Sequence, residues 1–194
     1  MNQKSNTTPA AAKNAKYRLF RSLRYLRFAA CLSAMSIILG KYLQIPNPFQ
    51  QLIRISFENL PILFAGITMG PIIGALVGIV ADLVGCLMVG YSINPLITAG
   101  AAAVGIVSGL VGYLWIRRPL WLRVGLSVLL AHLTGSVLIK SFGLAAWFLS
   151  SWGMGMMELI LWRLLTYTLV GTAEAVILGL LLSNRGFAKF FERR

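Results

Sequence analysis

The 194-residue sequence contains few charged residues and very few acids: 12% of its residues are charged, and only five are Asp or Glu. This is about half the share that soluble domains carry. Hydrophobic residues make up 58% of the chain, which excludes intrinsic disorder. The formal net charge is +13, yet a soluble nucleic-acid-binding protein is disfavoured, because a basic patch needs a charged surface around it.

Cysteine and histidine are also scarce. Cys31 and Cys86 both lie in apolar runs and are interpreted as small packing residues rather than a disulfide. His132 is the single histidine, and no zinc-ligand spacing exists, so no metal or cofactor is expected. The chain has no G-x-x-x-x-G-K-[ST] phosphate loop, and His132 has no evident nucleophile in register, so we predict that it is not an enzyme.

Long apolar runs dominate what is present. They predict an all-α integral membrane protein with six transmembrane helices, since each span needs about 20 apolar residues. The domain expected to span the membrane covers 28–183, between a basic N-terminal tail (1–27) and a basic C-terminal tail (184–194). The apolar runs are 28–43, 60–69, 72–89, 96–116, 120–139 and 159–182.

The basic residues are unevenly distributed over such a six-helix topology. Seven precede residue 28, three lie at 117–123 and four follow residue 184, so fourteen of the 18 Lys and Arg fall on one side. Positive residues favour the cytoplasmic side, which predicts that both termini are cytoplasmic. The exceptions are Lys41, Arg54, Lys140 and Arg163. The two lysines are interpreted as side chains that reach the interface from helix ends.

Polar residues inside the spans indicate packing rather than transport of ions. Asp82, His132 and Glu174 fall near mid-membrane, and we favour a structural polar cluster over a proton relay. Small residues recur at four-residue spacing, which allows helix backbones to approach closely. These residues are Gly70, Gly74 and Gly78, Gly105 and Gly109, and Ala30 and Ala34.

Candidate binding residues gather near the external ends of the spans. Three breaks there, 43–57, 90–95 and 140–157, are predicted to be the longest and most irregular loops. A pocket with aromatic walls and basic groups suits a flat heterocycle that bears a carboxylate. For each tryptophan, an interfacial aromatic belt is an equally good interpretation. The predicted substrate-binding residues are Arg54, Glu58, Tyr91, Asn94, Trp147, Trp162 and Arg163.

A family resemblance adds to this interpretation. The stretch R-I-S-F-E-N-L-P-I at 54–62, followed by Ala65-Gly66, Gly70-Pro71 and A-D-L-V-G at 81–85, resembles the substrate-binding S components of energy-coupling factor (ECF) vitamin transporters. The likeness extends from about 28 to 182 and is greatest to the folate family. One departure is Trp162, where many folate-family members have a proline before the arginine.

The resemblance implies a function and partners. It implies a six-helix protein of the cell membrane that binds folate near its outer surface and works with a coupling protein and two ATPases. Arg54 and Arg163 would then face an anionic ligand, Asn94 and Glu58 would bind a pterin edge, and Tyr91, Trp147 or Trp162 would stack on its face. The A-x-x-x-A motif would contact the coupling protein through Ala30 and Ala34, with Ala29 and Ser33 as an adjacent pair. The alternatives are another vitamin, such as pantothenate or a thiamin precursor, or a membrane scaffold that transports nothing.

Overall fold

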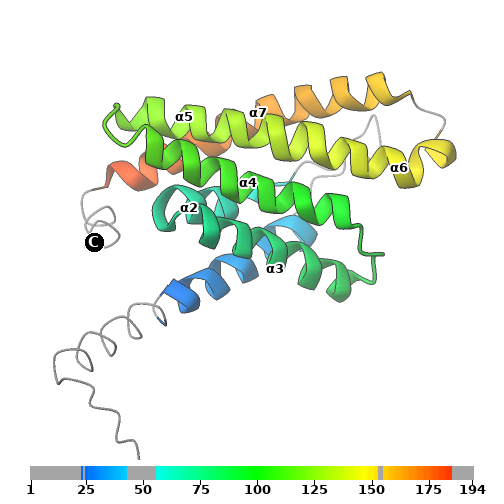
Figure 1. Cartoon of the computed structure of the whole chain (residues 1–194), viewed down its shortest axis with the longest axis horizontal. Coiled ribbons are helices and arrows are strands. Elements are labelled where there is room, and N and C mark those ends of the chain that lie inside the picture. The colour runs from blue at the N-terminus through cyan, green and yellow to red at the C-terminus, as the bar shows by residue number, and fades with distance from the viewer. Residues whose placement is uncertain (1–22, 24, 43–55, 153–154, 185–194) are drawn as a thin grey trace, which may run out of the picture.

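The computed structural model describes residues 23, 25–42, 56–152 and 155–184, and every regular element in these ranges is a helix (Figure 1). A first helix covers 25–37 and continues into the π-helical turn η1 (Ile38–Tyr42). The later elements are α2 (Asn59–Met69), α3 (Pro71–Val89), α4 (Pro95–Leu114), α5 (Leu120–Ala131), η2 (His132–Ile139), α6 (Lys140–Trp152) and α7 (Met156–Ser183).

Four of the described helices are long and apolar enough to cross a membrane. They are α3, α4, the continuous helix Leu120–Ala146 and α7. The α2 helix is apolar but has 11 residues, about half of what a span needs. The predicted all-helical membrane fold is therefore confirmed, whereas the count of six transmembrane helices and the cytoplasmic location of both termini stay predictions.

Two of the predicted breaks are confirmed by backbone geometry. Gly70 separates α2 from α3 with φ 103°, a value that favours glycine, and Pro71 then occupies the first turn of α3. Gly90 ends α3 with φ 75° in the left-handed region. Together these turns fold α2, α3 and α4 into consecutive antiparallel neighbours.

The predicted irregular segment at 140–157 is wrong over most of its length, because α6 is helical from Lys140 to Trp152. Gly143 lies within this helix. It serves close packing, since a Cβ there would lie 2.8 Å from the Cβ of Leu96. A glycine whose backbone makes the usual helical hydrogen bonds does not end a helix, and glycine is common in membrane helices.

Helix α4 lies at the centre of the bundle and packs against α2, α3, α5, η2 and α6. The predicted close approach of helices at small residues is confirmed here. A Cβ on Gly74 of α3 would lie 2.7 Å from the Gly105 carbonyl oxygen of α4 and 2.8 Å from the Gly66 Cα of α2. Three backbones thus meet where a side chain would keep them apart. The surrounding core includes Leu63, Val77, Val104, Val128 and Leu178.

The described chain ends lie at one end of the bundle. The first helix begins there, α7 ends there, and the α4–α5 connection with its basic residues turns at the same end (Figure 1). Arg123 ties this end together, because its guanidinium donates to the Ile67 carbonyl at 3.1 Å. The α3–α4 connection, the end of α6 and the beginning of α7 lie at the opposite end (Figure 1). That opposite end is where the candidate binding residues were predicted.

Candidate functional site

A small charged cavity lies between the first helix, α2, α3, α4 and α6. Its volume is about 20 Å³, enough for one or two water molecules. Its polar lining consists of two carboxylates, two ammonium groups and a hydroxyl. The residues that line it are Ser36, Ile37, Lys41, Glu58, Ile62, Gly78, Ala81, Asp82, Ala101 and Lys140. We call it the charged cavity.

An ion pair between Glu58 and Lys140 crosses this cavity. The Lys140 ammonium donates to Glu58 Oε1 at 2.9 Å, and Lys140 is only 5% exposed. Glu58 directly precedes α2 and is anchored through its backbone carbonyl, which accepts from Ser36 Oγ at 2.6 Å. Gly40 leaves room for it, because a Cβ at Gly40 would lie 2.7 Å from the Glu58 Cβ. A buried lysine is costly without a partner, so Glu58 is what allows Lys140 to point inward.

A second polar group extends the cavity towards α3 and α4. Thr98 donates to Asp82 Oδ2 at 2.7 Å, which links these two helices within the membrane. Lys41 lies with its ammonium 5.4 Å from the centre of the Tyr91 ring, a cation–π distance. Its stem passes Gly85, where a Cβ would lie 2.9 Å from Lys41 Cε. The cavity thus gathers two cations and two carboxylates from four helices: the first helix, α2, α3 and α6.

Arg163 lies on α7 beside η2 and is 6% exposed. Its Nε and Nη2 atoms both donate to the Ser136 carbonyl, at 3.1 and 2.6 Å. The guanidinium carbon also lies 5.2 Å from the centre of the Tyr167 ring. Arg163 therefore contacts Ser136 and Tyr167 and does not line the charged cavity.

Of the other predicted substrate-binding residues whose side chains the structure describes, Glu58 alone lines the charged cavity. Asn94 is 3% exposed and caps α4: its Oδ1 accepts from the Leu96 N–H at 3.0 Å, while its Nδ2 donates to the Gly143 carbonyl at 2.8 Å. Tyr91 is 43% exposed beside Lys41. Trp162 is half-buried on α7. Arg54 and the side chain of Trp147 lie outside the described residues.

Sequence reasoning missed the two lysines of the cavity. Lys41 and Lys140 were interpreted as interfacial side chains, but Lys140 points into the bundle. The signal that could have identified them is that they lie level with acidic residues of other helices. This can be recognised only when it is known which helices are neighbours. Asp82 also differs from expectation: it contacts Thr98, whereas His132 and Glu174 pair with each other elsewhere, at 2.5 Å. The single three-residue cluster is therefore not observed.

The four predicted partner-binding residues lie on two faces of the first helix. Ala30 and Ala34 are exposed. Ala29 packs against the hydrophobic core, and Ser33 is buried, with its hydroxyl bonded to the Ala29 carbonyl at 2.9 Å. Only the first pair is available to another protein at the surface of this chain.

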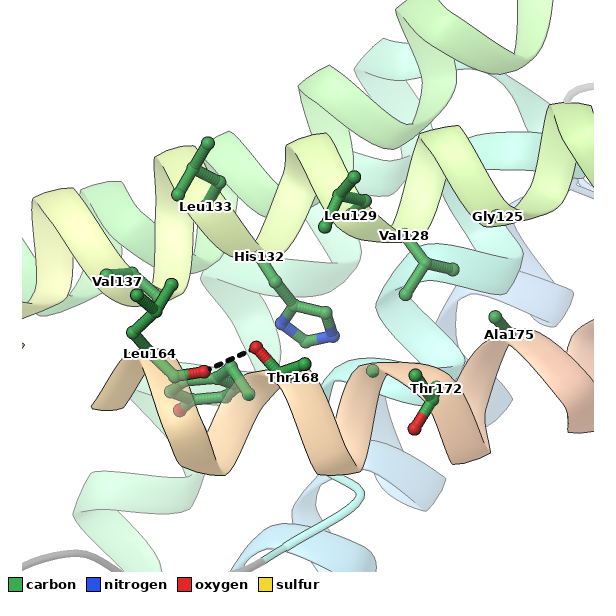
Figure 2. Close-up of a pocket in the computed structure, with 12 residues that line it drawn as sticks. Gly125, Val128, Leu129, His132, Leu133, Val137, Leu164, Thr168, Thr172 and Ala175 are labelled. Carbon is green, nitrogen blue, oxygen red and sulfur yellow. Dashed lines mark hydrogen bonds between the residues drawn. The ribbon is translucent and has the colours of Figure 1, made fainter. Parts of the chain in front are cut away.

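A larger groove of about 270 Å³ runs along the flank of the bundle between α5, η2 and α7 (Figure 2). Its walls are mostly aliphatic and small, with Leu129 and Leu133 on one side and Leu164 and Ala175 on the other. The His132 ring points between the helices at its base. The groove lacks the charged groups that a water-soluble anion requires, so the charged cavity remains the better candidate site.

The fold is that of a helical membrane protein with a small charged cavity inside its bundle. The family model described as ECF transporter, substrate-specific component matches residues 24–184, and the chain belongs to this family. It is an integral membrane protein of the cell membrane and a transport subunit rather than an enzyme. No curated protein sequence matches the chain.

A solved structure supports the same fold. The crystal structure of FolT bound with folic acid superimposes with a TM-score of 0.57 and 21% sequence identity, covering 87% of this chain and 93% of that one. At this identity the likeness concerns the fold alone.

Proposed function

We propose that the chain is the substrate-binding subunit of an ATP-driven vitamin importer and that its ligand is folate. The charged cavity carries this proposal: it holds an ion pair of opposite charges between the buried Lys140 and the partly exposed Glu58. Membership of the family supports a transported substrate, and FolT, a fold relative, binds folic acid.

The chemistry of folate matches the two charges. A pterin ring presents neighbouring N–H donors on one edge, which a carboxylate such as that of Glu58 accepts as a bidentate pair. The glutamate part of folate carries carboxylates, for which Lys140 and Lys41 are suitable partners. Arg163 adds positive charge near Glu58, and Arg54 precedes Glu58 by four positions in the sequence. A cationic vitamin such as thiamin would be disfavoured by the same groups.

The small size of the charged cavity implies an exchange of partners on binding. Pockets for molecules of this size occupy about 300–1,000 Å³, whereas this cavity offers about 20 Å³. A folate molecule would therefore separate Glu58 from Lys140 and satisfy each of them. A ligand with only one of the two functions would leave a buried charge without a partner, which is the physical basis for selectivity.

Titration of the purified protein in detergent tests this proposal. We expect folic acid to bind, and we expect Lys140→Met and Glu58→Gln to weaken binding at least tenfold, about 1.4 kcal/mol. Arg117→Met is a matched control, because Arg117 is exposed in the α4–α5 connection, at the end of the bundle where the described chain ends lie. Binding of pantothenate or a thiamin precursor instead of folate would favour the alternative vitamins. A protein that binds none of them would refute the proposal.

The proposal includes the partners of the family: a transmembrane coupling protein, two ATPase subunits and the surrounding lipid. We assign the coupling contact to the exposed Ala30 and Ala34 of the first helix, where two helices can approach closely. Ala34→Leu should reduce co-purification of the coupling protein while leaving folate binding unchanged. Ala99→Leu, at an exposed alanine of α4, is the control. Equal co-purification of both variants would argue against this assignment.

A further inference from the structure

A buried hydrogen-bond chain connects α2, η2 and α7 beside the charged cavity. Asn59 Nδ2 donates to Ser136 Oγ at 3.4 Å, Ser136 Oγ lies 3.2 Å from His132 Nδ1, and His132 Nε2 lies 2.5 Å from Glu174 Oε2. When the His132 imidazole is neutral and carries its proton on Nε2, each group in this hydrogen-bond chain donates to the next, in the direction from Asn59 to Glu174. All four residues are at most 3% exposed.

Ser136 is the centre of this arrangement because its backbone is also bonded. The η2 segment is π-helical at its end, since the Lys140 N–H bonds to the Gly135 carbonyl, five residues back. In an α-helix that N–H would take the Ser136 carbonyl. The Ser136 carbonyl is instead the acceptor for both Arg163 donors. Contacts to the Ser136 hydroxyl and to the Ser136 carbonyl thus both hold the π-helical segment in place.

The hydrogen-bond chain lies one helical turn from the ion pair of the charged cavity. Ser136 and Lys140 are four residues apart on η2 and α6, and Asn59 directly follows Glu58. The contact between Asn59 and Ser136 therefore runs alongside the contact between Glu58 and Lys140. A shift of η2 relative to α2 would change both distances together.

We propose that Glu174 and His132 are positioning residues for the substrate site, a role that rests on the proposed function. Glu174 orients the imidazole, the imidazole orients the Ser136 hydroxyl, and Ser136 fixes the turn that presents Lys140 to Glu58 and to the ligand. Glu174 does not line the charged cavity and bonds to His132, so among the described residues it acts on the ligand through this hydrogen-bond chain.

The test is a double-mutant cycle on the affinity for folic acid. Glu174→Ala should weaken binding about threefold to tenfold, and Glu174→Gln, which can still hydrogen-bond to His132, should restore most of the affinity. In a Lys140→Met background the Glu174→Ala change should have little further effect, because the group that it positions is gone. Ser136→Ala, a smaller change that preserves the backbone contact to Arg163, should weaken binding similarly.

Leu178→Ala is the matched control. Leu178 is fully buried on α7, four residues after Glu174, and belongs to the hydrophobic core. It should lower the melting temperature and leave the affinity for folic acid unchanged. If Glu174→Ala behaves like Leu178→Ala, or if its effect adds fully to that of Lys140→Met, the positioning role is refuted. A wild-type protein that binds no folic acid would overturn the proposed function, and with it this inference.

Discussion

Replacing Gly74 by alanine tests the junction of α2, α3 and α4 on which the bundle depends. The new Cβ would lie 2.7 Å from the Gly105 carbonyl oxygen and 2.8 Å from the Gly66 Cα. Comfortable contacts between heavy atoms need about 3.5–4.0 Å, so at least one backbone would have to move by roughly 0.7 Å. Neither neighbour is a flexible side-chain end, and overpacking of this kind costs about 1–3 kcal/mol.

Gly125→Ala isolates this cost from the intrinsic effect of removing a glycine from a helix. Gly125 lies in α5, and a Cβ there would meet nothing within 4 Å. Both substitutions gain the same helix propensity, about 1 kcal/mol, so the difference between the two variants reports the clash alone. We expect Gly74→Ala to melt several degrees below Gly125→Ala in detergent, at about 2–4 °C per kcal/mol. Equal melting temperatures would refute the close-packing argument.

Further substitutions probe other parts of the molecule. Asn94→Ala removes the cap of α4 and the bond to the Gly143 carbonyl, and should cost about 1–2 kcal/mol in thermal unfolding. Ser127→Ala removes a buried hydroxyl that lacks a partner among the described residues, so stability should be unchanged or higher. Arg54→Ala and Arg163→Ala should each weaken folate binding at least tenfold, measured by titration; unchanged affinity in both would contradict a role for these arginines in binding.

Much of the bundle was predictable, because it follows from local pattern. The glycines at four-residue spacing mark where α3 meets α4, and Gly70 and Gly90 mark the turns. The pairing of Asp82 with Thr98 was also accessible: the two residues lie eight positions on either side of Gly90, so a helical hairpin brings them level. Arguments of this kind need only the spacing between residues that are near in the chain.

The candidate site was predictable only in part, because its contacts join distant segments. Glu58 was identified from its place before an apolar helix, but its partner Lys140 is 82 residues away. Hydropathy cannot tell a lysine that points into a bundle from one that reaches the interface. The contact of Arg163 with the Ser136 carbonyl was equally inaccessible, because it depends on a π-helical register in η2 that leaves this acceptor to a side chain. Residue types alone do not reveal such a register.

The position of Glu58 bears on the proposed exchange of partners in the charged cavity. Glu58 stands at the N-terminus of α2, where the helix dipole favours a negative charge even in the absence of Lys140. Lys140, in contrast, lies inside the continuous helix Leu120–Ala146, so no helix terminus helps to stabilise its positive charge. The Glu58 carboxylate is therefore stabilised both by the dipole of α2 and by the ion pair. Of these two effects, only the ion pair stabilises the Lys140 ammonium. Lys140 therefore depends more on a charged partner than Glu58 does. A ligand that supplies an anion to Lys140 and N–H donors to Glu58 gives each residue a new partner, which favours a molecule carrying both groups.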